Sequence, residues 1–324
     1  MNLDMDVMAY LALVEGAKRP PLHQLLVPEA RAVYAAGCEA NGLPRNPLVS
    51  ITEIMAHTSA GVLNLRLYRM NGSGQSLAPG LVFFHGGGWV VGSLDTHDSI
   101  CRELAFAGGC CVIAVDYRLA PEHPFPAATD DAIASYRWIV EHAKELGIDA
   151  SRMGVAGDSA GGFLATYVAL SMRNDVAAIR PKLQLLFYPV TNLAAESAGY
   201  SRIASGFPFT GVTMRWFRDH YVSRDAGRSD DIRLAPLNAP DLVGSPDTLI
   251  VTSGSDPLYE EGAEYAHRLQ KADVRVNHLH LADQIHGFLT LGFRIKAART
   301  VLAWAVAYTR QKFNIDCVSP AQES

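Results

Sequence analysis

One serine stands in a setting that suits nucleophilic attack on a carbonyl carbon. Residues 153–170 read MGVAGDSAGGFLATYVAL, in which an apolar, strand-like run leads into GDSAG at 157–161 and a helical pattern follows. A G-x-S-x-G run at a strand-to-helix turn holds the serine on a sharp bend, and only small residues fit two places to either side. The hydroxyl of such a serine is exposed. We therefore expect Ser159 to be a nucleophile.

A serine hydroxyl needs a base and an orienting acid, which follow it in the chain order serine, acid, histidine. The histidines considered as the base are His220, His267, His278, His280 and His286. Only His286 stands in a loop after a strand with a small neighbour, in DQIHGFLT. Asp256 ends the run DTLIVTSGSD, which would bring it to the same sheet edge as Ser159. The sequence thus predicts Ser159, Asp256 and His286 as a catalytic set.

The neighbouring acids and histidines have simpler explanations. Glu260 and Glu261 are alternative acids, but they lie in the first turn of a helical pattern, where the helix dipole already accounts for a carboxylate. His278, His280 and Asp283 could form a metal site, yet no further ligand cluster accompanies them. We therefore expect neither a metal nor a cofactor.

Asp158, next to the serine, is expected to support the turn rather than to react.

Three glycines in a row follow the apolar run PGLVFFH, in HGGGW at 85–89. Attack on a carbonyl puts negative charge on its oxygen, and preorganised N–H groups stabilise that charge. The amide after the nucleophile, that of Ala160, is one donor, and the bare backbone supplies the others, expected from Gly86 and Gly87. A plain glycine turn would explain one or two glycines, but not three together with the serine motif and His286.

The elements that must position these residues alternate between strands and helices. Strand-like runs occur at 62–69, 80–85, 110–117, 152–157, 183–189 and 248–254, and helical patterns at 130–147, 160–173 and 259–272. This order predicts an α/β fold with a mostly parallel central sheet and helices on both faces. Ligands in such folds bind at the carboxyl ends of the strands. The expected core comprises residues 46–193 and 241–324.

Two segments, 1–45 and 194–240, fall outside this alternation. We expect both to form a lid over the strand ends, because long insertions there are usually functional; the alternative is that they only wrap the core. In the lid model the apolar stripe around Leu25 and Leu26 covers the strand ends. Phe207, Phe209 and Trp89 then contact the substrate.

Composition limits the partners. The chain of 324 residues carries 28 Lys and Arg against 33 Asp and Glu, a net charge of -5, which disfavours nucleic acid and acidic membranes. The five cysteines favour a reducing, cytoplasmic setting, and no signal peptide or membrane-spanning run is expected. The predicted partners are a small ester and water, with a homodimer left open.

The motifs as a set resemble a known family. HGGGW at 85–89, DYRLAPEHPFPAA at 116–128, GDSAGG at 157–162, SDPLYEEG at 255–262 and HGF at 286–288 are similar to those of the bacterial hormone-sensitive-lipase-like esterases. The resemblance implies the α/β-hydrolase fold with a helical cap. It implies the same catalytic set and oxyanion donors, and short- to medium-chain carboxylic esters as substrates. Amide, formamide or lactone hydrolysis and a non-catalytic ligand receptor of this fold are the alternatives.

Overall fold

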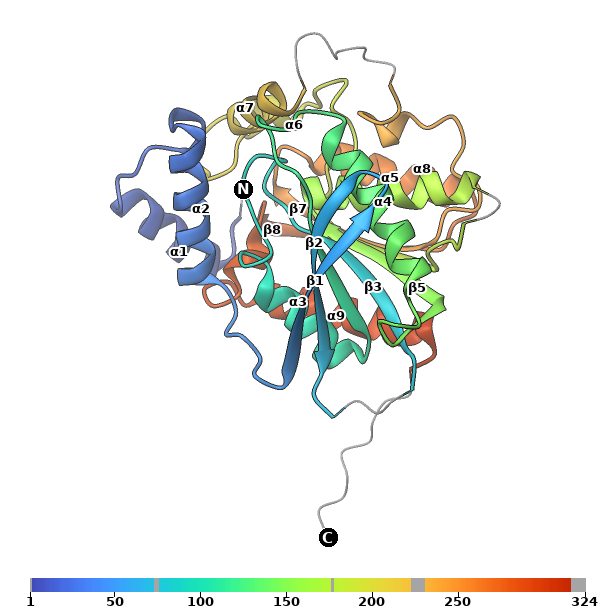
Figure 1. The fold of residues 1–324 in the computed structure, drawn as a ribbon. Coiled ribbons are helices and arrows are strands. Elements are labelled where there is room, and N and C mark those ends of the chain that lie inside the picture. Colours follow the sequence, from blue (N-terminus) through green and yellow to red (C-terminus); the bar gives the residue numbers. More distant parts are fainter. Residues whose placement is uncertain (1, 73–75, 176–177, 223–230, 316–324) are drawn as a thin grey trace.

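The fold is built around a central β-sheet (Figure 1). The computed structural model describes residues 2–72, 76–175, 178–222 and 231–315 of the chain. The eight strands of the sheet lie in the order β1-β2-β4-β3-β5-β6-β7-β8. The strands are β1 (Val49–Thr58), β2 (Gly61–Met70), β3 (Ala78–Phe84), β4 (Cys111–Asp116), β5 (Ile148–Asp158), β6 (Leu183–Phe187), β7 (Asp247–Ser255) and β8 (Val276–Ile285).

The sheet is parallel apart from one edge. β1 pairs antiparallel with β2, and β2 antiparallel with β4, whereas every pair from β4 to β8 is parallel. Strands β4 and β6 are apolar and almost wholly buried because helices cover both faces of a parallel sheet. The predicted α/β fold with a mostly parallel sheet is confirmed.

Helices cover both faces of the sheet (Figure 1). Helices α3 and α9 pack on one face, and α4, α5 and α8 on the other, so each face has its own apolar core. The bounds of these helices are α3 (Asp98–Gly108), α4 (Ala127–Glu141), α5 (Ala160–Asn174), α8 (Tyr259–Lys271) and α9 (Ala297–Phe313).

Strand β1 has no counterpart among the expected strands. Its exposed and buried residues do not alternate regularly, since it is the edge strand of the sheet and only part of its length contacts the core. The pattern that identifies a half-buried strand is therefore weak there.

Both segments that break the alternation lie at the end of the molecule towards which the parallel strands run (Figure 1). The first contains α1 (Met5–Gly16), the short η1 (Leu22–Gln24) and α2 (Val27–Asn41), and the second contains α6 (Gly199–Arg202), α7 (Gly211–Tyr221) and η2 (Pro236–Asn238). Residues 223–230 of the second segment lie outside the described residues.

The two segments touch each other and the core. His23 Nδ1 lies 3.1 Å from Thr213 Oγ1 and so links η1 to α7. Arg31 on α2 donates to the carbonyls of Val90 and Ala120, 2.8 and 3.0 Å away. Among the described helices, none is long and apolar enough to cross a membrane.

Candidate active site

The turn after β5 is forced by two glycines. Ser159 has φ +52° and ψ −118°, a backbone conformation that side-chain-bearing residues rarely adopt. A Cβ on Gly157 would lie 2.3 Å from the Gly161 backbone, and one on Gly161 would lie 1.9 Å from the Phe84 carbonyl oxygen. The Ser159 N–H donates to the Phe187 carbonyl at 2.9 Å. The bend therefore depends on both glycines, and it places the serine at the start of α5.

Ser159, His286 and Asp256 form one continuous chain of hydrogen bonds. His286 Nε2 lies 2.9 Å from Ser159 Oγ, and His286 Nδ1 lies 2.7 Å from Asp256 Oδ2. Asp256 is buried, and its other oxygen accepts the Leu258 N–H at 2.8 Å. The loops after β5, β7 and β8 bring the three residues together because parallel strands end at one edge of the sheet.

Two aromatic rings hold the imidazole of His286 in place. The Phe209 ring stacks on it with centroids 4.0 Å apart, and the Tyr188 ring lies at 4.8 Å. Burial raises the pKa of Tyr188 well above its ordinary value, so its hydroxyl stays neutral, and it accepts the Leu289 N–H at 3.3 Å. Rotation of His286 away from Ser159 would break these contacts.

The glycine loop presents different amides from those expected. The Gly86 N–H donates to Asp158 Oδ1 at 2.8 Å, so it is not available to a substrate, and the expected role of Gly86 as a donor does not fit this geometry. Gly87 (φ +119°) and Gly88 (φ +58°) follow it and line the cavity. Within the described residues, their N–H groups donate to no protein acceptor. The Ala160 N–H is free of an intrahelical partner because it starts α5.

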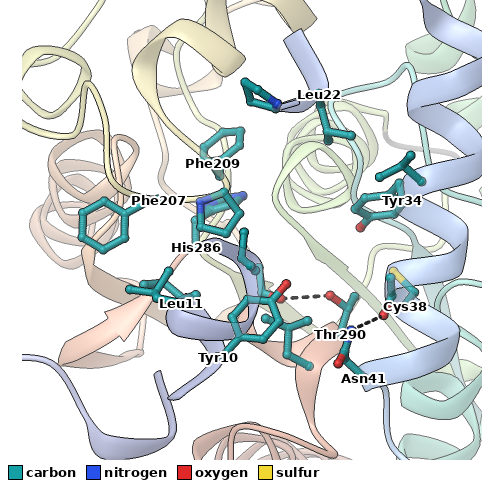
Figure 2. Close-up of a pocket in the computed structure, with 18 of the residues that line it drawn as sticks. Tyr10, Leu11, Leu22, Tyr34, Cys38, Asn41, Phe207, Phe209, His286 and Thr290 are labelled. Atoms are coloured by element: carbon teal, nitrogen blue, oxygen red, sulfur yellow. Dashed lines mark hydrogen bonds between the residues drawn. The ribbon is translucent and has the colours of Figure 1, made fainter. Parts of the chain in front are cut away.

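A cavity of about 710 Å³ opens above Ser159 (Figure 2). Strand-end loops form its floor, and both cap segments form most of its walls. The wall residues include Tyr10, Leu11, Leu22, Val33, Tyr34, Cys38, Asn41, Phe207, Phe209, Phe217 and Thr290. Phe207 and Phe209 thus lie where the sequence predicts them.

Two residues expected at the cavity lie elsewhere. Trp89 has no exposed surface; its ring stacks on Tyr221 with centroids 4.5 Å apart and packs edge-on against Phe163. It belongs to the core below the glycine loop, which corrects its expected contact with substrate. Leu26 is 72% exposed, because α2 begins one residue later and turns its apolar side inward from Ala30 onwards.

Cys38 and Thr290 also line the cavity, and neither is among the site residues predicted from the sequence. Cys38 is four residues from Tyr34 on α2, so the helical period places both on one face, and this period was the available signal. Burial raises the pKa of Cys38 to about 12, which keeps the thiol protonated. The short η3 (Phe288–Leu291), which carries Thr290, has no comparable sequence pattern.

The alternative acids and histidines have other contacts. Glu261 accepts the Thr191 and Asn192 N–H groups, and Glu260 pairs with Arg202. His278 and His280 both lie against Thr252 Oγ1, at 2.8 and 3.0 Å. Throughout the described part of the chain, no group of three or more His, Cys, Asp or Glu side chains is placed to hold a metal ion.

A serine, histidine and aspartate at the strand ends of such a sheet define a hydrolase of the α/β type. The model of the alpha/beta hydrolase fold family matches residues 81–290, and the chain belongs to that family.

Relatives named as ester hydrolases agree with this assignment. An ethyl acetate hydrolase of Pseudomonas putida is 38% identical over 96% of this chain and 99% of its own length. The carboxylic ester hydrolase LipN of Mycobacterium tuberculosis is 40% identical over 81% of this chain and 70% of its own. The predicted esterase of the hormone-sensitive-lipase-like type is confirmed.

Solved structures show the same fold. An ester hydrolase from the metagenome of Lake Arreo, in complex with a bipyridine phosphonate derivative, superposes with a TM-score of 0.90 at 37% identity, covering 96% of this chain and 99% of that one. An esterase from Pseudomonas putida superposes with a TM-score of 0.91 at 31% identity, covering 97% and 99%.

Proposed function

We propose that the protein is a serine carboxylesterase that hydrolyses short- to medium-chain acyl esters through an acyl-enzyme on Ser159. The observation that carries the proposal is the unbroken chain from Ser159 through His286 to Asp256, located at the floor of a largely apolar cavity. Names of relatives, among them an ethyl acetate hydrolase, agree with an ester substrate.

The first half of the reaction forms the acyl-enzyme. His286 Nε2 takes the hydroxyl proton as Ser159 Oγ attacks the ester carbonyl carbon. The N–H groups of Gly87, Gly88 and Ala160 stabilise the charge on the carbonyl oxygen. The positive end of the α5 dipole adds to this stabilisation. The imidazolium then gives its proton to the alkoxy oxygen, and the alcohol leaves as the C–O bond breaks.

The second half repeats these steps with water. His286 takes a proton from water, whose oxygen attacks the acyl carbon, and Ser159 regains its proton as the carboxylic acid leaves. Asp256 acts only on His286 and does not itself react. It holds the Nδ1–H of His286 and stabilises the imidazolium in both halves.

The proposed preference for acyl length follows from the cap segments, 1–45 and 194–240. Phe207 and Phe209 close one side of the cavity. Leu11 and Leu22, from the first cap segment, line another part of it. An apolar chain gains about 0.8 kcal/mol per buried methylene while room remains. Activity therefore rises with acyl length and then falls once the chain meets these walls.

The decisive experiment compares wild type with Ser159→Ala on p-nitrophenyl esters of increasing acyl length, beside a matched anilide. Loss of the nucleophile should lower kcat by roughly 10⁴- to 10⁶-fold. Ser50→Ala, an exposed serine on β1, is the matched control and should keep full activity. An alanine variant with a tenth of wild-type activity would refute the proposal, and faster turnover of the anilide than of the ester would favour an amide hydrolase.

We also propose a reducing, cytoplasmic setting. Cys38, Cys101, Cys110 and Cys111 are all buried and free, including the adjacent pair, and Cys317 lies outside the described residues. Thiol titration of the protein purified without reductant would find these thiols free. Sedimentation velocity on the same sample would tell a monomer from a homodimer.

A further inference from the structure

Behind the glycine loop lies a buried cluster that the reaction does not use directly. Asp158 Oδ1 accepts the Gly86 N–H at 2.8 Å and lies 3.1 Å from His97 Nε2. The other ring nitrogen, His97 Nδ1, lies 2.9 Å from Thr96 Oγ1. Asp158 and His97 are both almost completely buried. The cluster connects the nucleophile turn to the loop that carries the oxyanion amides.

The contacts of His97 show which protonation state fits all of its neighbours. Thr96 Oγ1 lies 2.9 Å from both the Ser93 carbonyl and His97 Nδ1, and its hydroxyl proton can serve only one of them. With that proton on the Ser93 carbonyl, Nδ1 donates to Thr96. Nε2 lies 3.1 Å from the Asp158 carboxylate, which only accepts, and 3.3 Å from the Gly86 nitrogen, whose N–H has a nearer acceptor in Asp158 Oδ1 at 2.8 Å. The imidazolium form of His97 satisfies the Ser93, Thr96 and Asp158 contacts together.

The other groups around this pair are compatible with a cation on His97. The ring of His85 is centred 5.6 Å away, and burial together with the neighbouring His97 lowers the pKa of His85 to about 4, so His85 is neutral. The Tyr117 hydroxyl donates to the His85 carbonyl at 2.7 Å. Burial by itself would raise the pKa of Asp158, but His97 and the Gly86 amide hold it below its ordinary value.

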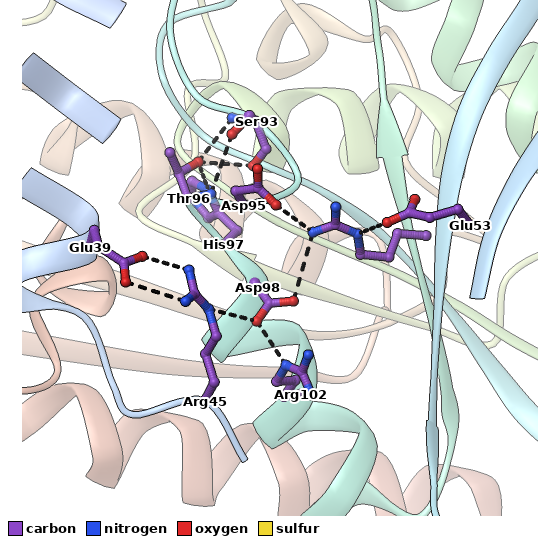
Figure 3. A network of polar contacts seen from close by, with 10 residues as sticks. Glu39, Arg45, Glu53, Ser93, Asp95, Thr96, His97, Asp98 and Arg102 are labelled. Atoms are coloured by element: carbon purple, nitrogen blue, oxygen red, sulfur yellow. Dashed lines mark hydrogen bonds and ion pairs between the residues drawn. The ribbon is translucent and has the colours of Figure 1, made fainter. Parts of the chain in front are cut away.

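The loop that carries His97 is itself fixed by charged contacts (Figure 3). Asp95 accepts from Arg66 at 2.8 Å, and Asp98 pairs with Arg102 at 2.7 Å and with Arg45 at 3.2 Å. These contacts hold the two residues flanking Thr96 and His97. The imidazole of His97 therefore has little freedom to move away from Asp158.

We propose that His97, as an imidazolium paired with Asp158, is a positioning residue for the oxyanion loop. The pair neutralises a buried carboxylate whose oxygen orients the Gly86 N–H. That bond in turn sets the direction of the next two amides, those of Gly87 and Gly88. The inference rests on the proposed function, because it concerns amides that contact the substrate only in that reaction.

Loss of His97 leaves the Asp158 carboxylate buried without a counter-ion. Such a group takes up a proton or draws water in, and either change loosens its bond to Gly86. Hydrogen bonds to the oxyanion form chiefly in the transition state, so the loss falls on kcat and not on KM.

The test begins with the wild-type enzyme. ¹⁵N NMR of the histidine side chains at pH 7, with His97 assigned by its absence in His97→Gln, should show both His97 nitrogens protonated. A neutral His97 would overturn the proposal. This measurement needs no activity and no stable variant beyond the assignment.

Kinetics on p-nitrophenyl butyrate supply the second readout. His97→Gln should lower kcat about 10- to 100-fold with KM within about twofold, a smaller loss than deleting an oxyanion donor outright. His57→Gln, at an exposed histidine on β1, is the matched control and should behave as wild type. Adding Asp158→Asn to His97→Gln removes the unpaired charge and should restore kcat at least fivefold.

The outcomes separate this inference from the proposed function. An unchanged kcat in His97→Gln with only a lower Tm would make His97 a packing residue and overturn the inference. A double variant no more active than His97→Gln would also overturn it. Failure of an organophosphate to label Ser159 in the active wild type would instead refute the proposed function.

Discussion

The ring of Phe209 lies almost flat against the imidazole of His286, with centroids 4.0 Å apart and planes 22° from parallel. A residue of the second cap segment thus touches the proposed base directly, although it lies far from it in the chain. The same ring lines the cavity. One side chain therefore contributes both to the orientation of the base and to the wall that limits the substrate.

Phe209→Ala should change both properties. We expect a roughly tenfold lower kcat/KM on a butyrate ester, because the imidazole loses a partner, and an optimum moved to longer acyl chains, because each additional methylene that fits gains about 0.8 kcal/mol. Phe207→Ala is the comparison, since Phe207 lines the cavity but its ring does not stack on His286. It should move the optimum with little loss on butyrate. If both variants lose stability with an unmoved optimum, neither ring limits the acyl chain.

Trp89→Ala should act on stability alone. Its ring is buried against Tyr221 and Phe163, so its removal should cost about 3–5 kcal/mol in the free energy of unfolding. Trp89→Phe keeps part of this packing and should cost less. The acyl-length profile of either variant should match wild type, measured beside urea unfolding. A shift in the acyl-length profile would indicate that Trp89 contacts the substrate.

Gly161→Ala should abolish folding or activity, since the added methyl would lie 1.9 Å from the Phe84 carbonyl oxygen. Gly37→Ala is the contrasting change. Gly37 lies within α2, and a Cβ there has no neighbour within 4 Å, so alanine should stabilise the helix by about 0.5–1 kcal/mol. Yield and Tm of the two variants test this. Equal effects of Gly161→Ala and Gly37→Ala on yield and Tm would contradict the crowding around Gly161.

Glu261 should make stability depend on pH. Burial raises its pKa from 4.5 to about 8, so the folded protein binds one more proton than the unfolded chain between these values. The protonated Glu261 stabilises the folded state fully below pH 4.5, and this stabilisation is lost as pH rises to about 8. The free energy of unfolding falls by roughly 5 kcal/mol at most over this range. Glu261→Gln has no such ionisation and keeps an oxygen for the Thr191 and Asn192 N–H groups.

As pH rises from 5 to 8, the free energy of unfolding of wild type should therefore fall relative to that of Glu261→Gln. Urea unfolding of both proteins at each pH measures this difference. Glu264→Gln, an exposed residue on the same helix, is the control and should run parallel to wild type. A constant difference between Glu261→Gln and wild type would contradict the expected ionisation.

The sequence predicts best what local pattern determines. The parallel strands β3 to β7 are largely continuous apolar runs, and Ser159 and Asp256 each directly follow one, so their meeting at one sheet edge follows from the topology. His286 follows β8, in which polar and apolar residues alternate, and its signal is its place in a loop beside a small residue. The orientation of a backbone amide has no such signal. Gly86 differs from Gly87 and Gly88 only because its N–H meets Asp158, a contact between residues 72 positions apart. Trp89 fits either a pocket wall or a core, and only packing decides between them.

The catalytic side chains and the cavity walls come from different parts of the chain. Ser159, Asp256 and His286 are held by loops of the sheet, whereas segments 1–45 and 194–240 supply much of the wall. Leu11 and Leu22 line the cavity with aliphatic side chains that cannot hydrogen-bond to the catalytic residues. A library randomised at such wall positions can therefore explore new ester preferences while each member keeps an intact reaction centre, which makes this scaffold a practical starting point for biocatalyst engineering.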